Sequence, residues 1–170
     1  LPVWHVRLAQ GVATAVAIVG GLKISSYAFG FDVPIDRLLF ADALGDNRMA
    51  PNTALCFLLG GIALAILDRV TRRGFWLAQC PAVLVVTISL VSLVGYGYGA
   101  ESLYQMASYV PMALNTATAF GVLAIGTLLA RPDRGIVAVV LDPGVGGMMA
   151  RRLLPAVIII PCGLGWLRII

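Results

Sequence analysis

Long apolar runs with few charges recur along this chain, and they restrict it to one kind of environment. Hydrophobic residues make up 60% of the 170 residues and charged residues only 12%, whereas soluble domains carry roughly a quarter charged residues. A helix needs roughly 20 residues to cross the hydrocarbon core of a bilayer. The chain therefore belongs in a membrane. A β-barrel is excluded, because its strands would be short and would alternate in polarity.

Five apolar runs predict an all-α, polytopic integral membrane bundle that forms a single domain over 1–170. The predicted transmembrane helices cover about 6–27, 52–67, 75–98, 110–130 and 153–170, with an inner loop over about 131–152. The last run stops just after Arg168, and we expect a sixth helix downstream.

One segment occurs twice in the sequence. Met49–Ala54, with Phe57 behind it, corresponds to Met112–Ala117, with Phe120 behind it, at a constant offset of 63 positions. The copies predict two tandem helical hairpins, about 6–67 and 75–130. Because each repeat has an even number of helices, the two should lie parallel and be related by an axis near the membrane normal.

The repeated Asn-Thr pairs, Asn52-Thr53 and Asn115-Thr116, are the candidate functional site. Each pair lies near the start of a predicted helix, so one interpretation is an N-cap. The other is a polar layer in which the two pairs hydrogen-bond each other, because an unpaired amide in hydrocarbon is costly. Such a layer would join the helices or bind a small polar ligand.

Three residues near the predicted outer helix ends, Asp32, Tyr96 and Glu101, are candidates for sensing at the outer face. The neighbouring Tyr27 and Tyr98 are typical, with Tyr96, of an aromatic belt at headgroup depth.

Arginine is concentrated on the other side of the predicted bundle. The residues there are Arg7, Arg69, Arg72, Arg73, Arg131, Arg134, Arg151 and Arg152. Since cytoplasmic loops are enriched in Lys and Arg, the N-terminus is predicted to be cytoplasmic. Arg131, Arg134, Arg151 and Arg152 are also predicted to bind anionic lipid headgroups.

No residue pattern indicates catalysis or a metal centre. His5 is the only histidine, and Cys56, Cys80 and Cys162 have no ligand-like spacing. We predict no catalytic residue, no metal and no cofactor, with a lipid or pigment between the helices left open. A basic-aromatic pattern for nucleic acid is absent from the sequence.

Several of these segments resemble the amino-terminal membrane region of bacterial sensor histidine kinases and related signalling proteins. They are Met49–Leu55, Asn115–Ala117, Leu129–Gly135, and Gly146-Gly147 with Ala150–Pro155. The resemblance implies a sensory input module in the bacterial inner membrane. Such a module precedes PAS and kinase domains, is not catalytic itself, and works as a homodimer or larger assembly in the lipid bilayer.

Two other functions stay open. The chain could be a structural or accessory subunit of a larger membrane complex. A small transporter is less favoured, because no ionisable residue lies at mid-membrane depth in the five runs, where transport pathways usually carry one.

Overall fold

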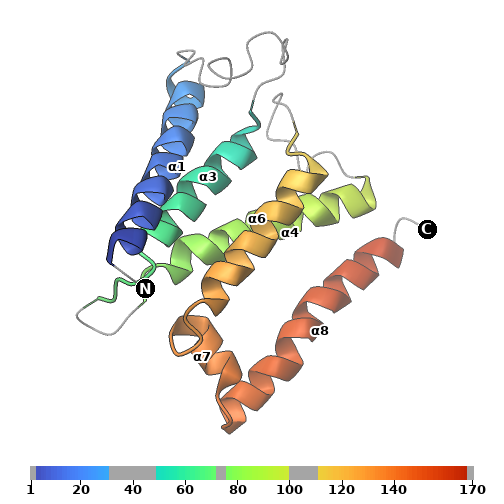
Figure 1. Cartoon of the computed structure of the whole chain (residues 1–170). Helices are drawn as coiled ribbons and strands as arrows, with labels where there is room; N and C mark the ends of the chain where they lie inside the picture. The colour runs from blue at the N-terminus through green and yellow to red at the C-terminus, as the bar shows by residue number, and fades with distance from the viewer. Residues whose placement is uncertain (1–2, 31–48, 72–75, 100–110, 168–170) are drawn as a thin grey trace.

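The computed structural model describes residues 3–30, 49–71, 76–99 and 111–167, and only the backbone of Val3 and Trp166. These residues form six α-helices: α1 Val3–Phe29, α3 Pro51–Ala65, α4 Gln79–Tyr98, α6 Leu114–Leu129, α7 Gly135–Leu141 and α8 Val145–Leu167 (Figure 1). The one β feature in the described part is an isolated bridge between Val70 and Trp76. The predicted all-helical class is confirmed.

Helices α3 and α6 begin at corresponding positions of the repeated segment. The residue before each helix is extended, with φ −61° and ψ 142° at Ala50 and φ −64° and ψ 146° at Ala113. Pro51 is the first helical residue of α3, where its missing N–H and fixed φ are favourable. Leu114 occupies the equivalent position of the repeated segment and begins α6, although it is not a proline.

Helices α1 and α3 form the first hairpin and approach each other backbone to backbone. A Cβ added to Gly20 would lie 2.4 Å from the Leu58 nitrogen, and one added to Gly61 would lie 2.6 Å from the Ala17 nitrogen. Gly20 of α1 faces Leu58, whereas the earlier residue Ala17 faces the later residue Gly61 of α3, so the two helices are antiparallel. Small residues at such points let helix backbones gain dispersion contacts that larger side chains would prevent.

Helices α4 and α6 form the second hairpin with a similar face of small residues. A Cβ added to Gly121 would lie 3.5 Å from the Ser89 Cβ, an ordinary contact. The buried Ser92 hydroxyl donates to the Met112 sulfur at 3.8 Å. The Ser89 hydroxyl is also buried and has no hydrogen-bond partner among the described residues. The packing at Gly121 is therefore less tight than the packing of the first hairpin at Gly20 and Gly61.

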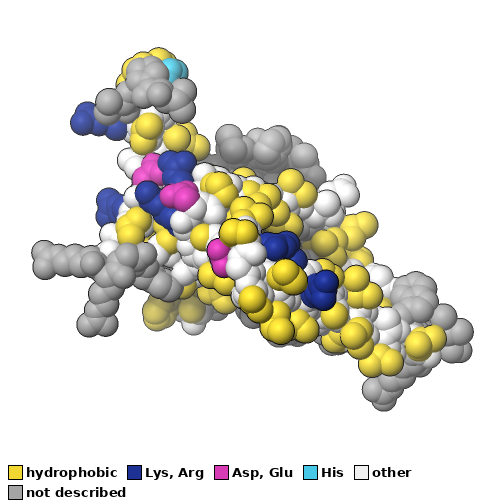
Figure 2. Space-filling model, turned by 90° about the horizontal axis from the view of Figure 1, so that it is seen from below, with side chains coloured by type: hydrophobic (Ala, Val, Ile, Leu, Met, Phe, Trp, Pro, Cys, Tyr) yellow, Lys and Arg dark blue, Asp and Glu magenta, His cyan; other side chains and the backbone are white. Residues whose placement is uncertain are grey.

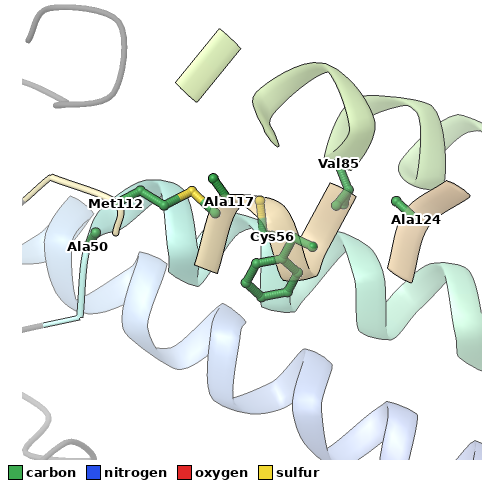
Figure 3. Close-up of a cluster of buried hydrophobic side chains, with 7 residues drawn as sticks. Ala50, Cys56, Val85, Met112, Ala117 and Ala124 are labelled. Carbon is green, nitrogen blue, oxygen red and sulfur yellow. The ribbon is translucent and has the colours of Figure 1, made fainter. Parts of the chain in front are cut away.

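The two hairpins meet through α3, which packs against both α4 and α6. A cluster of buried apolar side chains lies where they meet (Figure 3), and its members are Ala50, Cys56, Val85, Met112, Ala117, Phe120 and Ala124. Several of these side chains are small, so the helices can lie close together. The core of the bundle is thus the junction between the hairpins.

Beyond α6 the chain turns through α7 into α8, which stands apart from the hairpins in Figure 1. Gly135 begins α7 at φ +61°, and the Ile136 N–H donates to the Gln79 side-chain oxygen at 3.1 Å. Arg151 then donates to the carbonyls of Val140 (2.5 Å) and Asp142 (3.1 Å) at the end of α7. These bonds fix the turn to α4 and α8.

The inner loop predicted over 131–152 is therefore partly helical, since it contains α7 and the first turns of α8. The apolar stretch Gly135–Leu141 is long enough for two helical turns, and α8 starts directly after the Asp142-Pro143-Gly144 bend. The glycines Gly146 and Gly147, which lie in that predicted loop, are inside the helix.

In the part of the chain that the structure describes, three helices are long and apolar enough to span a membrane, namely Trp4–Phe29, Gln79–Tyr98 and Val145–Gly165. The chain thus has the character of a membrane protein. The other two apolar helices, Pro51–Ala65 and Leu114–Leu129, are shorter, at 15 and 16 residues.

The close approach of α1 and α3 predicts different effects at two adjacent glycines. Gly61→Ala forces a Cβ against the α1 backbone and should destabilise the bundle by about 1–3 kcal/mol. Gly60→Ala is the matched control, because its Cβ meets nothing within 4 Å. Reversible unfolding of both variants in detergent measures the difference. Equal stabilities would show that the helices do not approach at Gly61.

Candidate functional site

The predicted Asn-Thr layer lies in the first turns of α3 and α6. Asn52 and Asn115 are each the second residue of their helix, and neither helix has a side-chain N-cap bond. The N-cap interpretation is therefore wrong. Asn115 is exposed, whereas Asn52, Thr53 and Thr116 are half-buried. Asn52 has an interaction partner, and the pairing of Asn52-Thr53 with Asn115-Thr116 stays a prediction.

Contacts between corresponding residues of the two hairpins occur instead further along α3 and α6. The rings of Phe57 and Phe120 meet edge to face, with centroids 5.0 Å apart and an interplanar angle of 85°. At the far end of the same helices, the Arg131 Nε donates to the Asp68 carboxylate at 3.0 Å. Both pairs are separated by 63 residues, the offset of the sequence repeat. Residues at matching positions of the sequence repeat are thus in contact at two points along α3 and α6.

The tyrosines that the sequence assigns to an aromatic belt are bonded to backbone carbonyls. The Tyr27 hydroxyl donates to the Met49 carbonyl, and the Tyr96 hydroxyl donates to the Met112 carbonyl at 2.6 Å. In each hairpin, therefore, the end of the first helix is tied to the residue two places before the second. We call this end of the bundle the tyrosine end.

Tyr98 makes a third bond of this kind, from the last residue of α4 to the Cys162 carbonyl of α8. A Cβ on Gly165 would lie 2.8 Å from the Tyr98 oxygen, so α8 also needs a small residue here. One turn of α4 thus binds the start of α6 through Tyr96 and holds α8 through Tyr98. In the sequence, aromatic residues and glycines near a helix end indicated that this region is distinctive. The carbonyl groups to which the tyrosines bond could not be deduced from that pattern.

Of the three predicted outer-face residues, Tyr96 lies at the tyrosine end, and Asp32 and Glu101 lie outside the described residues. The sequence places Lys23 near an outer helix end, where a long side chain is expected to reach the interface, but Lys23 is only 2% exposed. Its ammonium lies 6.0 Å from the centroid of the Tyr27 ring, within reach of a cation–π interaction.

The opposite end, where α3 and α6 terminate, we call the arginine end. Figure 2 looks onto the molecule from below and shows dark-blue Lys and Arg side chains spread among apolar ones. Arg131 is paired with Asp68, Arg134 lies 3.4 Å from Asp133, and Arg151 binds the α7 carbonyls. Arg152 is exposed. The predicted headgroup arginines are thus spread over α8 and the turn before α7.

An apolar groove of about 450 Å³ runs between α1 and α6, with α3 as its floor. Its lining includes Val12, Val16, Phe57, Gly60, Phe120 and Leu123. A second hollow of about 400 Å³ shares Ala9 and Leu64 with the groove and adds His5, Gln10 and Asp68. The two form one depression that becomes polar toward the arginine end.

The described residues contain no group of three or more His, Cys, Asp or Glu side chains placed to hold a metal ion. His5 stacks on Trp4 with ring centroids 3.6 Å apart. The cysteines of the described part are free thiols. The described residues at the two ends offer apolar surface, backbone-directed tyrosines and arginines, which suit packing and lipid contact.

Comparison of the chain with protein-family models, with curated proteins and with solved structures finds no match.

Removing the Tyr96 hydroxyl tests the tie between α4 and α6. Tyr96→Phe loses the bond to the Met112 carbonyl, a change of about 0.5–1.5 kcal/mol, and should loosen the first turn of α6. Hydrogen exchange of peptides covering 111–118 should become faster. Thr118→Val is the control, because that hydroxyl bonds only within its own helix, to the Leu114 carbonyl. Unchanged exchange in Tyr96→Phe would contradict the tie.

Proposed function

We propose that this chain is the membrane-embedded sensory input module of a bacterial signalling protein of the histidine-kinase type. In this proposal its two hairpins are tandem copies that cross the inner membrane in parallel, α8 makes the fifth crossing, and the chain itself is not catalytic. The observation that carries the proposal is the double attachment of α4 at the tyrosine end, through Tyr96 to α6 and through Tyr98 to α8.

Corresponding contacts support the duplication. A residue that touches its own counterpart lies near a twofold axis, as in a symmetric dimer interface. The Phe57–Phe120 and Asp68–Arg131 pairs supply two such points along α3 and α6, which run in the same direction in Figure 1. An axis through both points lies along the helices. This agrees with parallel repeats related about the membrane normal.

Five crossings require α3 and α6 to return the chain across the bilayer, although at 1.5 Å per residue they are only roughly 22–24 Å long. α1 has 27 residues, roughly 40 Å, and packs antiparallel to α3. The Tyr27–Met49 bond keeps the start of α3 close to the end of α1. The turn after α3, which includes the Ile66–Ile62 and Arg69–Ile66 bonds, adds further length.

The arginine end is the cytoplasmic end in this proposal, and it places the N-terminus inside. A change in ligand or membrane at the tyrosine end would move the α4 terminus. Because Tyr98 holds α8, the movement would reach α8 directly, and a two-state shift of α8 is a signal that kinase domains can read.

Cysteine labelling tests this topology in a cysteine-free background. Phe29→Cys and Gly97→Cys, at the tyrosine end, should react with an impermeant maleimide added to intact cells. Thr71→Cys and Pro132→Cys, at the arginine end, should react only after permeabilisation. Labelling of all four from one side would contradict five crossings.

The asparagines remain a proposed part of the signalling mechanism, because each lies three residues after a methionine whose carbonyl accepts a tyrosine bond. The double variant Asn52→Leu with Asn115→Leu should insert normally and alter the stimulus response, measured as autophosphorylation of the full-length protein. The neighbouring exposed Thr118→Val is the control. A normal response in the double variant would remove the asparagines from the mechanism.

A structural or accessory subunit is the second candidate function, favoured by the surface of α8. Its apolar side chains are exposed on several faces, including Leu153, Val157, Ile159, Ile160 and Leu164. A partner helix would cover such a surface as well as lipid does. Stoichiometric copurification of other membrane proteins, with no kinase domain encoded in the same reading frame, would decide for this function.

A further inference from the structure

The two hairpins do not contact each other symmetrically, and the groove lies where a contact is missing. α4, the first helix of the second hairpin, packs against α3 of the first hairpin. Under the proposed twofold relation, α1 should pack against α6 in the same way. It has no comparable contact, and the groove of about 450 Å³ occupies the space between them.

Glycine keeps this space open. Gly60 lines the groove, and a Cβ built on it meets nothing within 4 Å. Its neighbour Gly61 makes the tight contact with α1 and fixes the position of the groove floor. The groove is therefore bounded by a firmly packed helix pair on one side and by Phe120 and Leu123 of α6 on the other.

The depression formed by the groove and the second hollow changes from apolar to polar along its length. Along α1 it extends from His5 to Val16, a length of roughly 16 Å at 1.5 Å per residue. This is close to half the hydrocarbon thickness of about 30 Å, which is the depth of one leaflet. Its deep part is apolar, and its polar part with His5, Gln10 and Asp68 lies at the arginine end, where headgroups would be.

Hydrogen-bond donors at the polar end fit a phosphate. Asp68 also lines this end, but its carboxylate is paired with the Arg131 side chain, whose Nε donates to it at 3.0 Å. His5 and Gln10 are exposed and half-buried, respectively, and both can donate hydrogen bonds. A basic surface next to a headgroup attracts anionic lipid groups.

We propose that the groove binds one phospholipid of the arginine-end leaflet, with an acyl chain along α3 between α1 and α6 and the phosphate near His5 and Gln10. This site is independent of the sensory role, because it depends only on the chain lying in a membrane. The lipid takes the place of the missing contact between α1 and α6.

Photoactivatable phospholipid in nanodiscs tests the site with the whole chain. A diazirine at the end of the acyl chain should label groove residues such as Phe57 and Leu123. A diazirine close to the glycerol should label the region of His5 and Gln10. Even labelling of all exposed apolar residues, α8 included, would show ordinary boundary lipid and would overturn the proposal.

Filling the groove provides the matched comparison. Gly60→Leu should abolish most groove labelling, whereas Gly126→Leu should not, because Gly126 also has nothing within 4 Å but does not line the groove. If Gly60→Leu fails to fold, Leu123→Trp fills the space from α6, with Leu129→Trp as its control. Unchanged labelling in the folded groove variant would refute the site.

Competition identifies other occupants. Excess unlabelled phospholipid should remove the groove labelling, and an isoprenoid quinone at the same concentration should not. Displacement by the quinone alone, or cross-links between two copies of the chain through the groove, would assign it to a different partner and overturn the phospholipid proposal.

Discussion

The backbone contact between α1 and α3 is the constraint on which the rest of the structure depends. Lipid tails are as apolar as leucine, so helices in a membrane associate through close packing and polar contacts rather than through the hydrophobic effect. Gly20 and Gly61 allow α1 and α3 to approach closely enough for that packing. α3 then becomes the surface on which α4 and α6 assemble. The tie at Tyr27, the phenylalanine pair and the groove all take their positions from this helix pair.

The sequence predicted the helical class, because long uncharged runs leave a membrane chain few alternatives. The last predicted helix, about 153–170, was placed too late, since α8 already begins at Val145. The residues at which the helices begin were harder to predict from the sequence. Pro111 lies four residues before Asn115, whereas Pro51 directly precedes Asn52, and proline favours the first helical position. The two helices nevertheless both start one residue before their asparagine. The short helix α7 was missed, since seven apolar residues between turns carry too weak a periodic signal.

The candidate site was harder to predict than the fold. Asn52 and Asn115 attract attention because an amide is unusual in an apolar segment. The contacts seen between positions 63 residues apart are instead those of Phe57 with Phe120 and of Asp68 with Arg131. Nothing in a phenylalanine identifies it as an interface residue within a chain that is 60% hydrophobic. Pair contacts depend on how the two hairpins are rotated about each other, and that rotation is a property of the packed bundle.

The three tyrosine bonds share one chemical property, which is that each accepting oxygen belongs to the main chain. Substitutions at Met49, Met112 and Cys162 would therefore leave the acceptors in place, provided that the local backbone is unchanged. These joints constrain spacing and not residue identity. Insertions or deletions should consequently be tolerated far less there than changes of side chain, and covariation between the partners would be a poor guide to finding them.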